Sequence, residues 1–272
     1  MIPSTDPVSL SDAANDAPAT DPQTPQPGMD QGPTRKLRVA AVGDLHVGET
    51  SERPYRDLFE RVGDDADVLC LCGDLVNYGK TREVEILLED LKACRIPIVG
   101  VLGNHEHECG QPDHVFRMLC DAGVKMLGEG RAYEIEGVGF AGGKGFVGGF
   151  GRYMLSPFGE QSIKTFVGEA IEDANAIDTS IRTLRTERSV VMLHYAPVVE
   201  TVMGEPPEIH AFLGSSRLAE TIDRYDNVKL VVHGHAHRGA HEGRTNKGVP
   251  VYNVALPVLR TLGDTPYRVF EI

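Results

Sequence analysis

Short runs of apolar residues recur along the chain, and each has about the length of one β-strand. Apolar runs of this length that end at turn residues are typical of strands buried on both faces. Between successive runs, apolar residues recur at helical spacing in 55–62 and 83–94. Strands that alternate with helices predict an α/β fold. The clearest strand runs are residues 37–43, 68–72, 96–102, 189–193 and 228–232.

The remaining stretches predict further elements of both kinds. Residues 132–141 resemble a hairpin that turns near Gly137. Between 160 and 186, apolar residues recur at helical spacing, which predicts a long helix packed on the core. Ser215 or Ser216 is a suitable cap for a helix that ends near residue 225. Shorter predicted elements are a helix over 113–121 and strands over 249–255 and 267–272.

Glycine dominates residues 137–151, where eight of fifteen residues are Gly. Residues 143–148 fit the pattern G-x-G-x-x-G, but the sequence that follows, through Pro157, predicts no helix, so a dinucleotide fingerprint is excluded. A P-loop is excluded because Gly145, not Ser or Thr, follows Lys144. Two interpretations stay open: a mobile flap beside a site, and a plain surface loop.

Composition divides the 272-residue chain into a tail over residues 1–33 and one folded domain over residues 34–272. Residues 1–33 hold seven of the seventeen prolines and five acids, which predicts a disordered tail. Residues 34–272 have enough apolar content for one large core, since the whole chain is 41% hydrophobic.

Charge and cysteine usage limit the partners and the compartment. Asp and Glu outnumber Lys and Arg by 40 to 27, and no basic run could follow a phosphate backbone, so duplex nucleic acid is an unsuitable partner. Five cysteines in a chain of this size fit a reducing compartment. No window reaches the run of about 18 apolar residues that a membrane span needs. These features predict a cytoplasmic protein without a membrane partner, and they leave its oligomeric state open.

Five polar pieces stand apart because nearly all of them follow a predicted buried strand directly. Chemistry in open α/β sheets lies beyond the carboxyl ends of the strands. Each piece alone is weak evidence for a site, but all five together make a purely structural role improbable. In chain order they are Asp44-Leu45-His46, Gly73-Asp74, Gly103-Asn104-His105-Glu106, His194 and Gly234-His235-Ala236-His237.

The order and content of these pieces resemble the calcineurin-like metallophosphoesterase family over about residues 37–256. The resemblance implies a four-layer α/β/β/α sandwich, with two mixed sheets face to face, helices outside, and a dinuclear metal site at the carboxyl ends of the strands. It implies one ion on Asp44, His46, Asp74 and His237, and a second ion on Asp74, Asn104, His194 and His235. His, Asp and Asn donors suit Mn, Fe, Zn or Co, and we favour Mn.

The resemblance also implies a hydrolase in which a metal-bridging hydroxide attacks phosphorus in line. His105 lies next to a predicted ligand and is the candidate catalytic donor to the leaving oxygen. Glu106 either orients His105 or a ligand, or is a surface acid.

Phosphoserine and phosphothreonine phosphatases of this family carry an Asp-Arg pair where this chain has Asn77-Tyr78. They carry a second arginine where this chain has Leu102. Without that bidentate clamp we expect a phosphodiesterase for a small phosphorylated substrate, in first place a nucleotide. The alternatives are a phosphomonoesterase or protein phosphatase, and a non-catalytic scaffold of the same fold. Further candidate positioning or substrate-contacting residues are Asn77, Lys144, Arg152 and Arg238.

Overall fold

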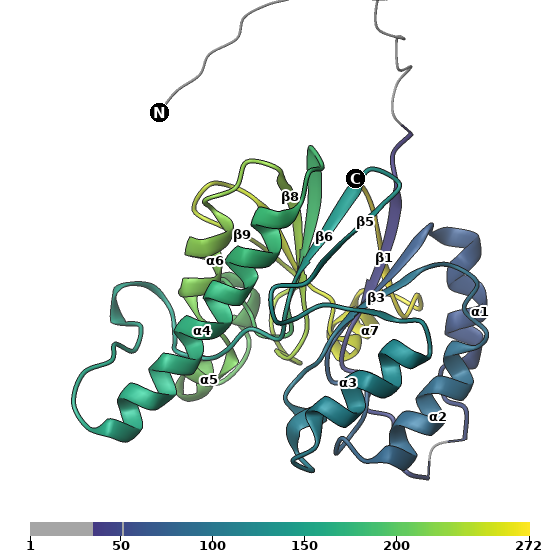
Figure 1. The fold of residues 1–272 in the computed structure, drawn as a ribbon, viewed down its shortest axis with the longest axis horizontal. Helices are drawn as coiled ribbons and strands as arrows, with labels where there is room; N and C mark the ends of the chain where they lie inside the picture. The colour runs from purple at the N-terminus through teal and green to yellow at the C-terminus, as the bar shows by residue number, and fades with distance from the viewer. Residues whose placement is uncertain (1–34, 51) are drawn as a thin grey trace, which may run out of the picture. The chain divides into compact units, whose positions relative to one another are not determined.

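A computed structural model describes residues 35–50 and 52–272, so the predicted tail over 1–33 lies outside the described residues. The described chain forms two mixed β-sheets (Figure 1). In spatial order, the first sheet contains β11 (Arg268–Glu271), β1 (Arg38–Val42), β2 (Val68–Cys72), β3 (Ile98–Val101) and β4 (Lys125–Met126). The second contains β5 (Ala132–Ile135), β6 (Val138–Gly142), β7 (Arg188–Met192), β8 (Val228–His233), β10 (Pro250–Asn253) and β9 (Glu242–Arg244).

Both sheets have parallel strands in the middle and antiparallel strands at an edge. Strands β1 to β4 are parallel, and β11 pairs antiparallel with β1. Strands β6, β7, β8 and β10 are parallel, while β5 and β9 pair antiparallel with the outer two of them. The carboxyl ends of the parallel strands are therefore the places where loops from distant parts of the sequence can meet.

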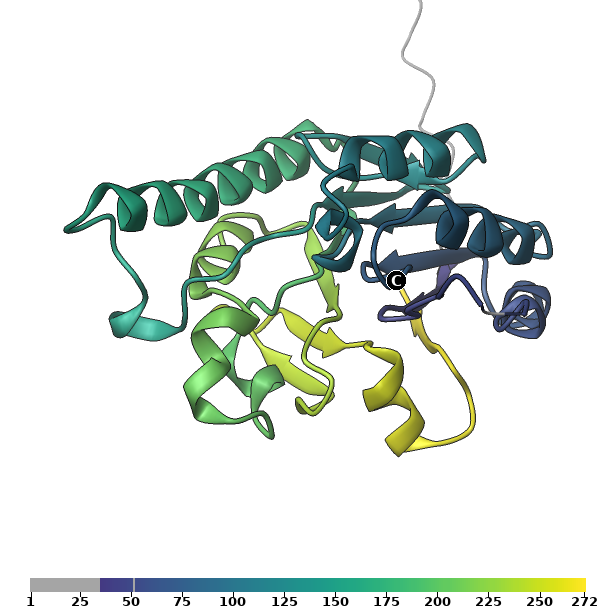
Figure 2. The same ribbon diagram turned by 90° about the horizontal axis from the view of Figure 1, so that it is seen from below.

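Helices cover the outer face of each sheet, as the blue and green ribbons in Figures 1 and 2 show. Helices α1 (Arg56–Asp65), α2 (Thr81–Leu91) and α3 (Pro112–Asp121) contribute to the same apolar cluster as the first sheet. Helices α4 (Gln161–Thr183) and α6 (Ser216–Ile222) pack with the second sheet. Two short helices complete the set, α5 (His210–Leu213) and α7 (Leu256–Leu262), with 3-10 turns at His105–His107, Gly151–Tyr153, Val199–Val202 and Pro207–Ile209.

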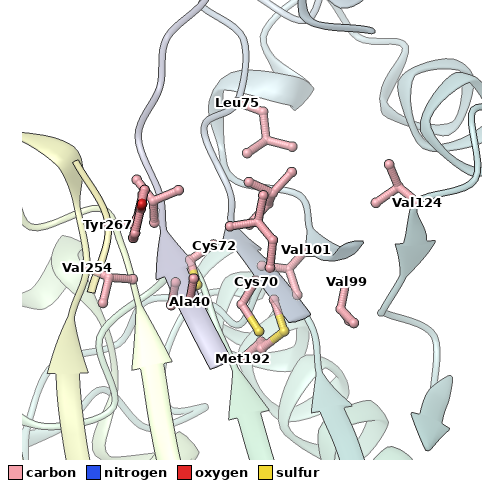
Figure 3. Close-up of a cluster of buried hydrophobic side chains, with 14 of the residues drawn as sticks. Ala40, Cys70, Cys72, Leu75, Val99, Val101, Val124, Met192, Val254 and Tyr267 are labelled. Atoms are coloured by element: carbon pink, nitrogen blue, oxygen red, sulfur yellow. The ribbon is translucent and has the colours of Figure 1, made fainter. Parts of the chain in front are cut away.

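Alternation along β8 explains how the second sheet is buried on both faces. Leu230 and Val232 belong to the core shared with the first sheet, whereas Val231 belongs to the cluster under α4 and α6. Figure 3 shows Cys70 of the first sheet and Met192 of the second within one apolar cluster. The arrangement is the predicted four-layer sandwich, and every layer boundary is apolar.

The glycine-rich segment is mostly buried. Its backbone amides bond to other loops: Gly143 N–H to the Met192 carbonyl (3.1 Å) and Gly148 N–H to the Ala211 carbonyl (2.9 Å). The interpretation as a plain surface loop is therefore wrong, because most of residues 142–149 have little contact with solvent.

Among the described residues, no helix combines the length and the apolar character that a bilayer crossing requires. All five cysteines lie in this part of the chain, and none forms a disulfide.

Candidate metal centre

The polar pieces that follow the strands converge at one place. Three groups of three side chains could each hold a metal ion, because the donor atoms within each group all lie within 4.8 Å of one another. The first and second groups share His46, and the second and third share Asp74. The donors come from loops after β1, β2, β3, β7 and β8, so both sheets contribute. The groups are Asp44 with His46 and His237, His46 with Asp74 and His105, and Asp74 with His194 and His235.

Asp44 organises one end of this cluster. Its buried carboxylate accepts the His235 backbone N–H (3.0 Å) and lies 2.9 Å from Nε2 of His237. That hydrogen bond raises the pKa of His237. Nε2 of His237 also lies 3.4 Å from Nε2 of His46, so two imidazole nitrogens and a carboxylate face one small space.

Asp74 lies between the groups and is almost completely buried. Its Oδ1 accepts the His105 backbone N–H (2.9 Å) and lies 3.3 Å from Nε2 of His194. Its Oδ2 lies 3.9 Å from Nε2 of His46. Burial alone would raise the pKa of Asp74, but His194 and the His105 amide hold it well below its usual range. Burial alone would lower the pKa of His194, but its contact with the Asp74 carboxylate raises that pKa to about 9.

The donor orientation fits a bound cation. Nδ1 of His194 donates to the Cys72 carbonyl (3.0 Å), so Nε2 is the nitrogen that carries the second proton or, once that proton is released, would bind a cation. That nitrogen faces Oδ1 of Asn104 at 2.9 Å and the Asp74 carboxylate. Facing acceptors repel each other unless a proton or a cation lies among them. The donor set is oxygen and imidazole nitrogen without thiolate, which suits first-row divalent ions.

His235 completes this end. Its Nε2 donates to the Phe212 carbonyl (3.2 Å), so Nδ1 is the nitrogen left for a ligand. Burial lowers the pKa of His235 to about 3, and the ring is neutral, as a metal ligand must be.

The backbone is strained where these side chains are presented. Asp44, His46, Asp74 and His235 have φ between 49° and 71°, the left-handed region that non-glycine residues rarely adopt. A Cβ at Gly103 would lie 2.2 Å from Oδ1 of Asp74, so only glycine allows this approach. Such strain clusters at functional sites, where the surrounding structure maintains it.

A family model of calcineurin-like phosphoesterases matches residues 37–239, which is most of the chain. The protein belongs to the calcineurin-like phosphoesterase family. It is therefore a hydrolase that acts on phosphoric ester bonds, and its family binds two divalent metal ions.

Known relatives resemble this phosphoesterase in fold more than in sequence. Phosphopantetheinyl hydrolase from Mycobacterium tuberculosis is similar with a TM-score of 0.61 at 17% identity, over 87% of this chain and 96% of that one. The protein TT1561 of Thermus thermophilus is similar with a TM-score of 0.51 at 13% identity, over 87% and 99% of the two chains.

One curated relative is similar in sequence over a short segment. A probable cyclic nucleotide phosphodiesterase of Moraxella catarrhalis (strain BBH18) is 34% identical over 82 residues. The match covers 27% of this phosphoesterase and 30% of that relative's own length.

Glu106 of this phosphoesterase is completely buried, so the interpretation as a surface acid is wrong. Its carboxylate accepts three backbone N–H groups: those of Asp74 (3.1 Å), Val76 (3.0 Å) and Gly103 (2.6 Å). Burial and the nearby Asp74 carboxylate raise the pKa of Glu106 to about 7. Glu106 thus ties the loop after β2 to the loop after β3, and it positions Asp74 through the backbone.

His105 lies at the half-buried edge of the cluster of this phosphoesterase. Its Nδ1 donates to the Asn77 carbonyl (2.6 Å), its Nε2 lies 3.8 Å from Oδ2 of Asp74, and its ring contacts that of His46. Asn77 therefore contributes its backbone carbonyl to this contact.

The three predicted cationic contacts differ in position. Lys144 lines a cavity together with Asn104, and its ammonium lies 3.4 Å from the Asp173 carboxylate. The Arg152 guanidinium contacts Tyr153 in a local, exposed turn. Arg238 is exposed. Among the described residues, no contact links the side chains of Arg152 or Arg238 to the predicted ligands, whereas Lys144 lies beside one of them.

Sequence reasoning missed a buried polar residue below the His-x-His loop of this phosphoesterase. Asn253 of β10 donates from Nδ2 to the Ala236 carbonyl (2.7 Å), and its Oδ1 accepts the Ala255 N–H (3.1 Å). Ala236 stands between the two histidines of that loop, so Asn253 fixes the loop from beneath. The only signal in the sequence is one polar residue within the apolar run 249–255.

His233, at the end of β8, is buried in the same network. Its Nε2 lies 2.8 Å from the Thr201 hydroxyl, and its Nδ1 donates to the Gly234 carbonyl (2.8 Å). Burial lowers its pKa to about 4. His233 supports the loop and does not face the cluster.

Proposed function

We propose that this phosphoesterase is a phosphodiesterase for a small substrate, in first place a nucleotide diester. The observation that carries the proposal is a cluster of oxygen and imidazole donors with no arginine side chain in contact with it among the described residues. A phosphodiester carries one negative charge and needs fewer cationic contacts than a dianionic monoester. Tyr78 and Leu102 stand where the family's protein phosphatases have arginines, and Lys144 is already paired with Asp173.

The proposed ligand sets combine the first donor group with Asp74 and the third with Asn104, and they leave out His105. Asp44, His46, Asp74 and His237 would hold one ion, and Asp74, Asn104, His194 and His235 would hold the other, with Mn favoured over Fe, Zn or Co. When bound, the two ions would supply positive charge for the phosphoryl oxygens and lower the pKa of a bound water. The scaffold alternative has little support, because no ligand position is missing and all converge.

His105 is the proposed proton donor to the leaving oxygen. With Nδ1 already donating to the Asn77 carbonyl, a second proton on Nε2 makes an imidazolium. The Asp74 carboxylate, 3.8 Å away, stabilises that positive charge and aims the ring toward the cluster. The partially open position of the ring, with 34% of its side chain exposed, leaves room for a substrate oxygen.

The electrostatic balance of the chain supports small substrates. With 13 net negative charges, the protein would repel duplex nucleic acid, and a free nucleotide or similar metabolite is the proposed partner. Five unpaired cysteines support the cytoplasm as the proposed location.

The test compares chromogenic esters that share one leaving group. We expect the Mn-loaded protein to hydrolyse bis-p-nitrophenyl phosphate with a higher kcat/KM than p-nitrophenyl phosphate, and to bind about two metal ions per chain. A preference for the monoester would support a phosphatase instead. Protein that binds no metal and hydrolyses neither ester would contradict the proposal.

A further inference from the structure

A groove leads away from the metal cluster on the side of Asn104. A cavity of about 350 Å³ is lined by Asn104, Tyr195 and Phe146 together with acidic residues of α4. A second cavity of about 450 Å³ lies among α3, α4 and the segment 142–145. The two share His107, Lys144 and Asp173, so they form one groove, which we name the Asn104 groove.

The near part of the groove is in contact with the cluster. The ring of Tyr195 contacts those of His235 (4.5 Å between centroids) and His194 (5.4 Å). An organic group attached to a phosphate at the cluster could therefore enter the groove directly past Asn104. A cavity of this size that buries much of a small ligand is the usual form of a substrate site.

The charges in the near part exclude a second phosphate. Glu169, Glu172 and Asp173 line it against the single ammonium of Lys144, which leaves two net negative charges. Lys144 is occupied by Asp173 (3.4 Å) and by the Gly145 carbonyl (2.9 Å). Carboxylates repel phosphate but accept hydrogen bonds from hydroxyl groups. The near part therefore suits an uncharged, hydroxyl-bearing group such as a sugar.

The far part suits a flat and largely apolar ring. Its apolar residues include Phe116, Leu127 and Ile177, and the glycine-rich backbone of 142–145 forms another wall without side chains apart from Lys144. Its charges balance, and the Arg131 guanidinium is already engaged over the Phe116 ring (4.7 Å) and with Glu129 (3.0 Å). A neutral heteroaromatic ring can pack against these apolar walls.

We infer that the Asn104 groove holds the nucleoside part of the substrate. The sugar hydroxyls bond to Glu169 and Glu172, and the base lies in the far part between Phe116 and Ile177. This assignment rests on the proposed function, because it takes the phosphodiester to be at the metal cluster. The assignment predicts that the substrate is a diester of a nucleoside monophosphate. It excludes binding of a nucleoside polyphosphate with its additional phosphates in the groove.

Two esters with the same chromophore test the assignment. Thymidine 5′-(p-nitrophenyl phosphate) and methyl p-nitrophenyl phosphate differ only in the group expected in the groove. The first variant is Ala176→Phe, because Ala176 lines the far part and a larger side chain there fills it. The matched control is Asn175→Phe on the exposed face of the same helix.

We expect Ala176→Phe to lower the ratio of kcat/KM for the nucleoside ester over the methyl ester by about tenfold, the loss expected when apolar contact with a base is removed. Asn175→Phe should leave both values unchanged. An unchanged ratio in Ala176→Phe overturns the groove assignment, whereas wild-type protein that hydrolyses neither ester overturns the proposed function instead.

A binding measurement on the metal-free full-length chain separates the two ideas further. Saturation-transfer NMR with thymidine should detect contacts with the base protons in wild type and Asn175→Phe, and lose them in Ala176→Phe. Equal signals in all three proteins would contradict the assignment without any dependence on catalysis.

Discussion

The cluster of candidate metal ligands has a buried end and an open end, and different contacts hold the side chains at each end. At the buried end, the side chains of His194 and Asp74 are 0% and 2% exposed. At the open end, those of His46 and His237 are 22% and 41% exposed. The buried donors are fixed by backbone groups of neighbouring loops, namely the Cys72 carbonyl and the His105 amide. The open donors mainly contact each other and Asp44.

This difference in exposure and contacts indicates that the two ends of the cluster have different roles. We infer that the donors held by backbone contacts would preset the geometry of one proposed metal site, and that water and substrate would reach the cluster from the other end. We therefore expect the ion at the open end to exchange faster and to be lost first on dilution. Single-residue variants test this asymmetry, beginning with Asp74, which belongs to both proposed ligand sets.

The largest effect is expected for Asp74→Asn, because this carboxylate belongs to both proposed ligand sets. The amide keeps the size of the side chain but removes its negative charge. We expect kcat/KM to fall by at least about a thousandfold and the metal content to fall below one ion per chain. Elemental analysis and ester hydrolysis measure both. Asp226→Asn, at an exposed carboxylate, is the control, and full metal content in Asp74→Asn would refute the shared role.

Next in size is the contrast between His194→Ala and His237→Ala. Both should lose about a hundredfold or more in activity through lost metal affinity. Only His194→Ala leaves a buried cavity and an unpaired Cys72 carbonyl, so it should lower the free energy of unfolding of the metal-free protein by about 2–4 kcal/mol. His237→Ala should change it by less than about 1 kcal/mol.

Urea unfolding measures the difference in stability between the two variants. Rescue of activity by added imidazole is a second test of the contrast between the two ends. Imidazole can reach the open end and should restore part of the activity of His237→Ala but not of His194→Ala. Equal rescue of both variants would mean that the cluster has no buried end in solution.

His105→Ala tests the proton donor at the half-buried edge. For esters with alkyl leaving groups we expect kcat to fall by about a hundredfold, because the leaving alkoxide needs a proton. For p-nitrophenyl esters the loss should be much smaller, since p-nitrophenolate leaves without one. Metal content should stay unchanged, and His114→Ala on α3 serves as the control. An equal loss with both kinds of ester would argue against proton donation.

The smallest effect is expected for Asn253→Ala and Asn253→Asp, because Asn253 supports the loop that carries both His235 and His237. The aspartate keeps the acceptor for the Ala255 amide but loses the donor to the Ala236 carbonyl. We expect both variants to weaken metal binding about tenfold by loosening the loop of His235 and His237. Calorimetric titration with Mn measures this, with Asn246→Ala as an exposed control. Unchanged affinity in both would make Asn253 a purely structural residue.

The core of the fold could be predicted from the sequence because its strands are buried on both faces. Strand β2 is apolar and buried at every position, so its bounds were predicted correctly at 68–72. Strand β9 was missed because Glu242 and Arg244 are exposed at a sheet edge and leave no apolar run. Helix α7 was missed because its start at Leu256 follows directly on the apolar run that contains β10.

The polar pieces of the site could be predicted because each follows a strand, and their convergence is confirmed by the three donor groups. The supporting residues could not. Glu106 acts through backbone amides of other loops, and Asn253 lies 17 residues beyond the carbonyl that it holds. Contacts of this kind depend on how the sheets pack, which no local pattern encodes. The assignment of each ligand stays a prediction.

The left-handed backbone positions set a limit for anyone who wishes to make this enzyme more heat-resistant. Seven non-glycine residues in the described chain have positive φ, and four of them present donors of the cluster. Glu136 lies on the surface at the turn between β5 and β6, and glycine or asparagine there would relieve the conformation without touching the cluster or the Asn104 groove. The same exchange at His235 would remove the imidazole for which the conformation exists. Substitutions that aim to raise thermal stability should therefore begin at Glu136 in the hairpin turn and leave the loops of the donor cluster unchanged.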